Sequence, residues 1–310
     1  MTDTSAPRPF FEIRDLSLRP VPALLGILAT PVIMQAVLLA GREPARWLWK
    51  QGPEDWAARS WIFIALALLL QAVVGLAAIG AFKLAFPKLD AHLRWPQKGR
   101  SLAGLALLIG IGMGVIMLVG DFWSQLLSRT PIDDFPVDPI DSPGWLFAMS
   151  ITGLAEETIF RGLIVGLLVL AIPGRVRIGP VDLPLAAYIA SLLFGLAHYD
   201  TFFNSPLHLA IAQQIYAFIW GLVYVWLMEK SDSLLAPTIA HGAGNAVEVG
   251  LAMAFTATLT WRAQSWKPTR RGSSRTRPSG RSARPARRPD VRARTDSARH
   301  RRSSRPAGSA

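Results

Sequence analysis

The stretch WIFIALALLLQAVVGLAAIGAF, residues 61–82, contains no charged side chain and only one strongly polar side chain, Gln71. An α-helix rises about 1.5 Å per residue, so a helix over this stretch is about 33 Å long. The hydrocarbon core of a bilayer is about 30 Å thick. The stretch therefore predicts a membrane-spanning helix, and the fold class depends on how often such stretches recur.

Apolar segments of this kind recur along the 310-residue chain, in which 51% of residues are hydrophobic and only 17% are charged. We expect spans at residues 21–41, 61–82, 102–120, 144–171, 184–200, 207–228 and 234–261. This pattern predicts an all-α fold, a polytopic transmembrane helix bundle of about seven spans. We accordingly expect a multi-pass integral protein of the cell (inner or plasma) membrane that is in contact with membrane lipid.

Four parts of the chain are expected from these segments. Residues 1–20 form a polar N-terminal lead-in, residues 21–143 hold the first helices and an acidic loop, and residues 144–261 hold the last helices. The connection at 173–184 is expected to be a short cytoplasmic turn. Residues 262–310 carry 16 basic and two acidic side chains, a net charge of +14, whereas the rest of the chain carries −2. This Arg-rich tail lacks the apolar residues of a core and is expected to be disordered, and no specific nucleic-acid partner is expected.

Small residues predict where helices approach one another closely. Gly110, Gly112 and Gly114 lie inside one expected span, and Gly162 and Gly166 lie inside another. Without side chains, such positions let a neighbouring helix come near. A nucleotide-binding loop is a poorer interpretation of 110–114, because no strand precedes the glycines.

Ionisable residues are concentrated in three of the expected spans. The motifs are Glu156-Glu157-x-x-x-Arg161, Phe194-x-x-x-His198 and His241-x-x-x-Asn245, with Glu248 one turn further on. A charged side chain at the centre of a membrane helix costs on the order of 2.5–3.5 kcal/mol on insertion scales, so such residues usually have a function. The three motifs are therefore the candidate site.

Spacing indicates which of these groups act together. Glu157 and Arg161 are four residues apart on one helix face and can neutralise each other, whereas Glu156 is rotated by about 100° and can point into a cavity. Phe194 shares a face with His198 and can orient its ring. A carboxylate in an apolar cavity can act as a general base on water, and imidazole and amide groups can donate to an oxyanion. The set suits hydrolysis of an amide bond.

Competing chemistries find less support. The chain has no cysteine, which excludes disulfides and a thiolate nucleophile, and it contains neither an H-E-x-x-H nor a G-x-S-x-G motif. A serine mechanism is weakened but not excluded.

The three motifs in this order, together with SLLFGLAHYDTFFN and SLLAPTIAHGAGN, resemble the CAAX protease and bacteriocin-processing (CPBP, or abortive infection) family of intramembrane proteases. The resemblance covers about residues 144–250, so residues 144–261 are expected to be a CAAX-protease-like catalytic membrane domain. Prenyl-protease members imply an eighth membrane segment where this chain has its tail.

The resemblance implies a role for each matched residue. Glu156 activates water, His198 helps to hold that water, and His241 with Asn245 forms the oxyanion site. Glu157 and Arg161 form a structural or substrate-orienting pair. An alternative metalloprotease mechanism uses Glu156, His198 and His241 as ligands of Zn²⁺. The cofactor is thus either none or Zn²⁺, with a slight preference for the metal-independent mechanism, and the partner is a peptide or protein substrate that reaches the bilayer.

Two other functions stay open from the sequence. One is a catalytically silent membrane scaffold or immunity factor of the same family. The other is a proton-coupled transporter that uses Glu156, His198 and Glu248 as a relay, although we find no internal repeat of the kind transporters often have.

Overall fold

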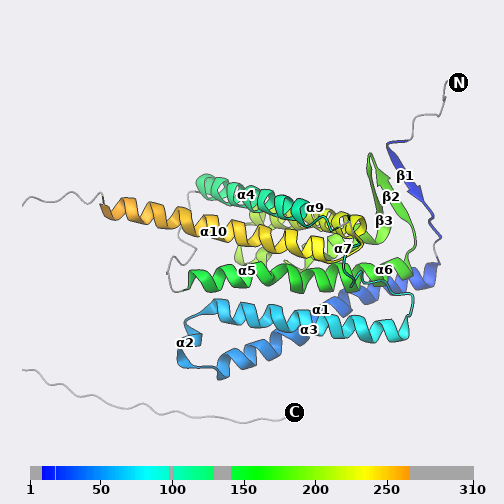
Figure 1. Cartoon of the computed structure of the whole chain (residues 1–310), viewed down its shortest axis with the longest axis horizontal. Coiled ribbons are helices and arrows are strands. Elements are labelled where there is room, and N and C mark those ends of the chain that lie inside the picture. Colours follow the sequence, from blue (N-terminus) through cyan, green and yellow to red (C-terminus); the bar gives the residue numbers. More distant parts are fainter. Residues whose placement is uncertain (1–8, 18, 98, 100, 129–140, 266–310) are drawn as a thin grey trace, which may run out of the picture. The chain divides into compact units, whose positions relative to one another are not determined.

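The computed structural model describes residues 9–265, except residues 18, 98, 100 and 129–140 (Figure 1). Most of the acidic loop and residues 266–310 of the Arg-rich tail lie outside the described residues. The prediction that the tail is disordered therefore falls on residues that the structure does not describe. The last helix continues to Ser265. The first four residues that the sequence assigned to the tail, 262–265, are therefore helical.

The described chain is mostly helical. Its elements in order are β1 (Phe11–Arg14), α1 (Pro20–Gln51), α2 (Glu54–Ala57), α3 (Ser60–Ala85), α4 (Ala103–Ser128), α5 (Ser142–Glu157), the π-helical segment η1 (Thr158–Val165), α6 (Gly166–Ala171), β2 (Arg175–Ile178), β3 (Val181–Pro184), α7 (Leu185–Leu196), α8 (Thr201–Asn204), α9 (Leu207–Ser231) and α10 (Leu235–Ser265).

Four helices of the described chain are long and apolar enough to cross a membrane: α1, α3, the segment Ala103–Gly120 of α4, and α9. They coincide with four of the seven expected spans and indicate a membrane protein. The count of seven is not confirmed. The other three expected spans carry the ionisable motifs. One of them is divided among α5, η1 and α6, and another holds α7, which has only 12 residues, a length of about 18 Å.

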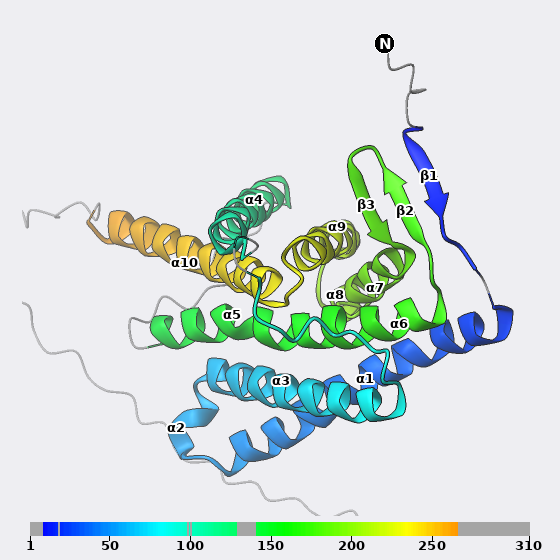
Figure 2. The ribbon, with the colours of Figure 1, turned by 45° about the vertical axis from the view of Figure 1, so that its right-hand side comes forward.

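The expectation of an all-α chain is wrong at one end of the bundle, where three strands form an antiparallel sheet in the order β1–β2–β3 (Figure 2). From the sequence, these residues were expected in the polar lead-in and in a turn. The local sequence explains why a strand forms here. The residues of β2 alternate between arginine and an apolar side chain, and this period of two is typical of a strand. Gly179, at φ +58°, then reverses the chain into β3.

The sheet has an apolar and a charged face because of its register. Phe11 pairs with Ile178, which pairs with Val181 on the other side. The alternate positions carry the ion pairs Arg14–Asp182 and Arg177–Glu12. These ion pairs fasten the N-terminal strand to the hairpin that follows α6.

The continuous helical stretch α5–η1–α6 runs through the middle of the bundle (Figures 1 and 2). Helices α1 and α3 pack on one side of it, and α7, α9 and α10 pack on the other, with α4 lying on α10. The candidate site lies on this central stretch. Residues from both sides of the bundle can therefore reach it.

The expected glycine contacts are confirmed at four of five positions. A side chain on Gly110 or Gly114 would collide with the backbone of α10, at the carbonyls of Ala240 and Gly244, whereas Gly112 faces open space. A Cβ on Gly162 would lie 3.0 Å from the side chain of Ile79, and one on Gly166 would lie 2.9 Å from the carbonyl oxygen of Asp90. Small residues therefore set the distance between α4 and α10, the helix that carries His241.

Candidate active site

Glu156 and Glu157 are the last two residues of α5. The helix then continues in the same direction and becomes the π-helical segment η1 (Figure 2). All eight residues of η1 are buried. π-Helical turns are rare and occur frequently at functional sites. The first motif thus begins where the helix changes its hydrogen-bonding pattern, inside the bundle.

Glu157 is the centre of a buried polar cluster, with a side chain that is 0% exposed. Its Oε1 accepts hydrogen bonds from Arg161 Nη1 at 3.1 Å and from His241 Nδ1 at 2.7 Å. The expected pair of Glu157 and Arg161 is therefore present, and it also holds the histidine of the third motif. This carboxylate joins η1 to α10.

Aromatic rings enclose Arg161 and His241, the two hydrogen-bond partners of Glu157. The guanidinium carbon of Arg161 lies 4.3 Å from the ring centroid of Phe194 and 5.0 Å from that of Tyr224. The His241 ring stacks on Tyr224, with centroids 4.8 Å apart and an interplanar angle of 16°. Such contacts attract a cation to the ring faces, so the cluster is held in one arrangement.

Glu156 lies on the other side of the His241 ring. Its Oε2 is 3.7 Å from His241 Nε2, and its side chain is 21% exposed. A neutral His241 carries its proton on Nδ1, where it donates to Glu157, and presents Nε2 to Glu156. The two adjacent glutamates therefore have different environments, since one is completely buried and the other opens to a cavity.

His198 lies just beyond the end of α7. Its Nδ1 is 2.9 Å from the carbonyl oxygen of Phe194, and its ring meets the Phe194 ring edge-on at a centroid distance of 5.3 Å. The expectation that Phe194 packs on this imidazole agrees with the geometry. With Nδ1 donating to the carbonyl, Nε2 is left as the acceptor of the neutral ring.

A cavity of about 250 Å³ brings the first two motifs together, because Glu156 and His198 both line it. The remaining lining comes from α1, from α3 and from the residues next to these two: Gln35, Leu38, Leu39, Arg42, Gln71, Phe160, Ala197, Tyr199 and Asp200. A carboxylate and an imidazole facing one small cavity can hold a water molecule between them.

Asn245 and Glu248 are not brought to this cavity. Asn245 lies one turn beyond His241 on α10 and is half-buried. Within the described residues, no side-chain hydrogen bond links it to the other motif residues. Glu248, the third member of the alternative proton relay, is also outside the lining. The oxyanion role of Asn245 therefore stays a prediction.

The proposed zinc ligands do not fit one ion as they are placed. Among the described residues, the ligand atoms of Glu156, His198 and His241 are not gathered within 4.8 Å of one another. Ligand atoms bonded to one Zn²⁺ at about 2.0–2.2 Å lie closer together than that. In this arrangement the three side chains do not form a zinc site.

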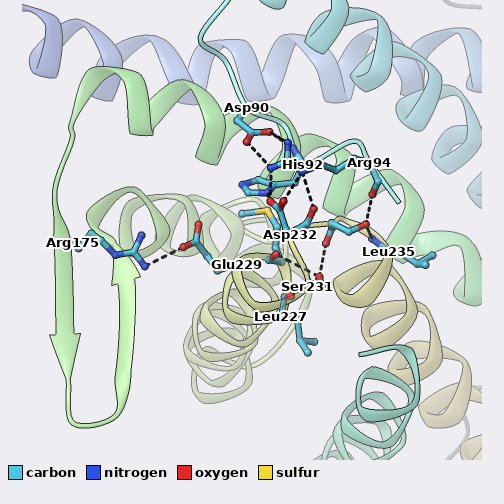
Figure 3. Close-up of polar contacts among 11 residues, drawn as sticks. Asp90, His92, Arg94, Arg175, Leu227, Glu229, Ser231, Asp232 and Leu235 are labelled. Atoms are coloured by element: carbon cyan, nitrogen blue, oxygen red, sulfur yellow. Dashed lines mark hydrogen bonds and ion pairs between the residues drawn. The ribbon is translucent and has the colours of Figure 1, made fainter. Parts of the chain in front are cut away.

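Ligand atoms of Asp90, His92 and Asp232, none of which belongs to the three motifs, do lie within 4.8 Å of one another (Figure 3). Arg94 forms ion pairs with both carboxylates, and His92 Nδ1 is 2.9 Å from Asp232 Oδ1. Hydrogen bonding from Arg94 lowers the pKa of Asp232, more than burial raises it. The guanidinium already pairs with both carboxylates, and these contacts tie the α3–α4 connection to the turn between α9 and α10.

Tyr224, Gln71 and Arg42 contribute to the site although the sequence analysis assigned them no role there. Tyr224 continues a stripe that starts at Tyr216 and Trp220, spaced four residues apart, with ring centroids 5.9 and 6.3 Å apart. That spacing was a usable signal for a shared helix face. No local sequence pattern predicts that α1 and α3 line the cavity, because this lining arises from packing between segments far apart in sequence.

Residues 139–247 match the family model described as type II CAAX prenyl endopeptidase Rce1-like. The matched segment covers about a third of the chain and contains every residue of the three motifs. The match confirms the family resemblance that the motifs indicated. No curated protein and no solved structure matches the chain.

Proposed function

We propose, on the premise that residues 139–247 form a domain of the CAAX protease family, that this protein is an intramembrane endopeptidase. One observation carries the proposal: Glu156 and His198 line the same cavity, and the carboxylate of Glu156 lies 3.7 Å from His241 Nε2. The proposed substrate is a peptide or a membrane-associated protein whose scissile bond enters the cavity. The protein is further proposed to be a multi-pass protein of the cell membrane.

The proposed reaction begins with a water molecule between Glu156 and His198. Glu156 removes a proton from the water while the water oxygen attacks the carbonyl carbon of the scissile bond. The tetrahedral intermediate then collapses, the C–N bond breaks, and Glu156 returns the proton to the leaving amine. Apolar walls keep other water away and strengthen the polar contacts in the cavity.

The proposed oxyanion site consists of His241 and Asn245. The Asn245 amide is a hydrogen-bond donor in any protonation state, whereas His241 donates from Nε2 only when its ring carries a second proton. Glu157 orients the ring, because its carboxylate accepts the hydrogen bond from Nδ1 at 2.7 Å. In this scheme Glu157, Arg161 and Phe194 are positioning residues that orient the two imidazoles.

The test is peptide cleavage by detergent-purified protein. We would use a fluorogenic peptide library in two halves, one with S-farnesyl cysteine and one without, because the family model describes a prenyl endopeptidase. Glu156→Gln is expected to lower kcat about 10²- to 10⁴-fold, the usual contribution of a general base. The control is Glu229→Gln, since Glu229 has a similar exposure of 25% but forms an ion pair with Arg175 outside the cavity.

Each outcome separates the proposed mechanism from an alternative. Cleavage that a chelator leaves intact and that Glu156→Gln removes supports the glutamate–water mechanism. Loss of cleavage in chelator, restored by Zn²⁺, shows that the site rearranges to bind a metal. Equal activity of Glu156→Gln and the wild type refutes Glu156 as the base. A wild type that binds peptides from the library but cuts none supports the silent scaffold.

A further inference from the structure

The wall of the cavity that faces the motifs comes from α1 and α3, outside the segment 139–247. Three polar side chains of these helices line it: Gln35, Arg42 and Gln71. In the sequence Gln35 and Gln71 belong to apolar spans, where polar groups are costly unless they have a function, and Arg42, an exposed residue, directly follows the first of these spans. Their place beside Glu156 suggests a function in substrate binding.

The turn of α1 that carries Arg42 is held firmly against α3. Gln71 is buried, and its Nε2 donates a hydrogen bond to the carbonyl oxygen of Leu38 at 3.1 Å. A Cβ on Gly41 would lie 2.6 Å from the backbone nitrogen of Gln71, so only glycine permits this contact. The residue after Gly41 is therefore presented to the cavity from a fixed backbone position.

Arg42 has no ion-pair partner among the described residues. The next arginine on α1, Arg46, pairs with Glu43 at 2.9 Å. Two acidic side chains line the cavity with Arg42, namely Glu156 and the exposed Asp200, yet neither forms an ion pair with it. Arg42 thus brings to the site a positive charge that is available to a ligand.

We propose that Arg42 binds a carboxylate of the substrate and so selects peptides with an anionic group near the scissile bond. This inference rests on the proposed function. A guanidinium can bind a carboxylate through two parallel hydrogen bonds, which gives direction as well as charge. A sphere of the cavity's volume is roughly 8 Å across, and an extended residue spans about 3.3–3.6 Å. The carboxylate therefore lies within about two to three residues of the bond that is cut.

A peptide offers two sources of that carboxylate, its C-terminus and an acidic side chain. The experiment uses one S-farnesyl CAAX-type peptide in three forms: the free C-terminal acid, the C-terminal amide, and the amide with glutamate as its last residue. The ratio of kcat/KM for each acidic form to that for the plain amide is measured. The variants are Arg42→Gln, Arg42→Lys and the control Arg46→Gln.

The wild type is expected to prefer at least one acidic form about 10- to 100-fold, the size of a hydrogen bond to a charged group. Arg42→Gln should bring that ratio close to one, and Arg42→Lys, which keeps the charge without the planar fork, should give an intermediate ratio. Arg46→Gln should keep the wild-type ratio. Equal ratios for the wild type and Arg42→Gln would overturn the inference.

A binding measurement keeps this test separate from that of the proposed function. The three peptides, labelled with a fluorophore, are titrated by anisotropy into Glu156→Gln protein and into Glu156→Gln/Arg42→Gln protein. Tighter binding of an acidic form that depends on Arg42 supports the inference even if the wild type cuts nothing. Arg42-dependent binding of anionic phosphatidylglycerol vesicles, with no discrimination among the peptides, would assign the site to a lipid headgroup and refute the peptide carboxylate.

Discussion

Replacing either of the two adjacent glutamates by glutamine should change the stability of the protein, but to very different extents. Glu157 is 0% exposed and its partner Arg161 is 1% exposed. Glu157→Gln therefore leaves a buried guanidinium without its counter-ion. Breaking a buried pair from one side costs about 3–5 kcal/mol of unfolding free energy. Glu156 is 21% exposed, with its nearest ion-pair contact at 3.7 Å, so Glu156→Gln should cost no more than about 1 kcal/mol.

Removal of both charges of the buried pair provides the control. The variant Glu157→Gln/Arg161→Met keeps a side chain of similar length among the rings of Phe194 and Tyr224 and leaves no uncompensated charge. It should recover a large part of the stability that Glu157→Gln loses, because the cost arises from the orphaned cation and not from the loss of attraction.

The assay is reversible unfolding in mixed micelles with rising dodecyl sulfate, followed by the fluorescence of the chain's 11 tryptophans. Cleavage is measured on the same samples. Glu156→Gln should unfold close to the wild type and cut peptide about 10²- to 10⁴-fold more slowly, whereas Glu157→Gln should unfold at a clearly lower denaturant fraction. The reasoning is refuted if both single variants are equally stable, or if the double variant is no more stable than Glu157→Gln.

Three further outcomes are expected. Gly110→Ala should destabilise the protein by about 1–3 kcal/mol, because its Cβ collides with the backbone at Ala240, whereas Gly112→Ala faces open space and should be neutral or slightly stabilising; thermal unfolding of the two variants compares them directly. The pKa of Asp232 is lowered by Arg94 in the folded protein, so its stabilisation should be fully present above its ordinary value of 3.8 and be lost as the pH falls further. The difference in melting temperature between the wild type and Asp232→Asn should thus be constant from about pH 5 to about pH 8 and should shrink below about pH 4. A difference that grows on acidification would contradict this. Finally, Tyr224→Phe should keep the stacking on His241 and most of the activity, whereas Tyr224→Leu should lose both, as measured by cleavage and unfolding.

Local patterns in the sequence determined the main helices of this protein and some of their contacts. Uninterrupted apolar segments require helices, because a backbone in lipid must satisfy its own hydrogen bonds, and four of the expected spans are helices of that kind. The spacing of four between Glu157 and Arg161 placed them on one face, and their ion pair is present at 3.1 Å. The close approach at Gly110 was also predicted from the sequence, although Gly112, in the same stretch, faces open space.

Packing between distant segments decided the remaining features. The sequence placed Glu156 and Glu157 about 100° apart, but only the position of α10 made Glu157 the buried partner of His241 and left Glu156 facing the cavity. The three-stranded sheet needed strands separated by about 160 residues to meet, which no local pattern encodes. Arg42 likewise reached the cavity through the contact of α1 with α3. Sequence periodicity fixes which face of a helix a residue occupies, whereas tertiary packing determines what that face meets.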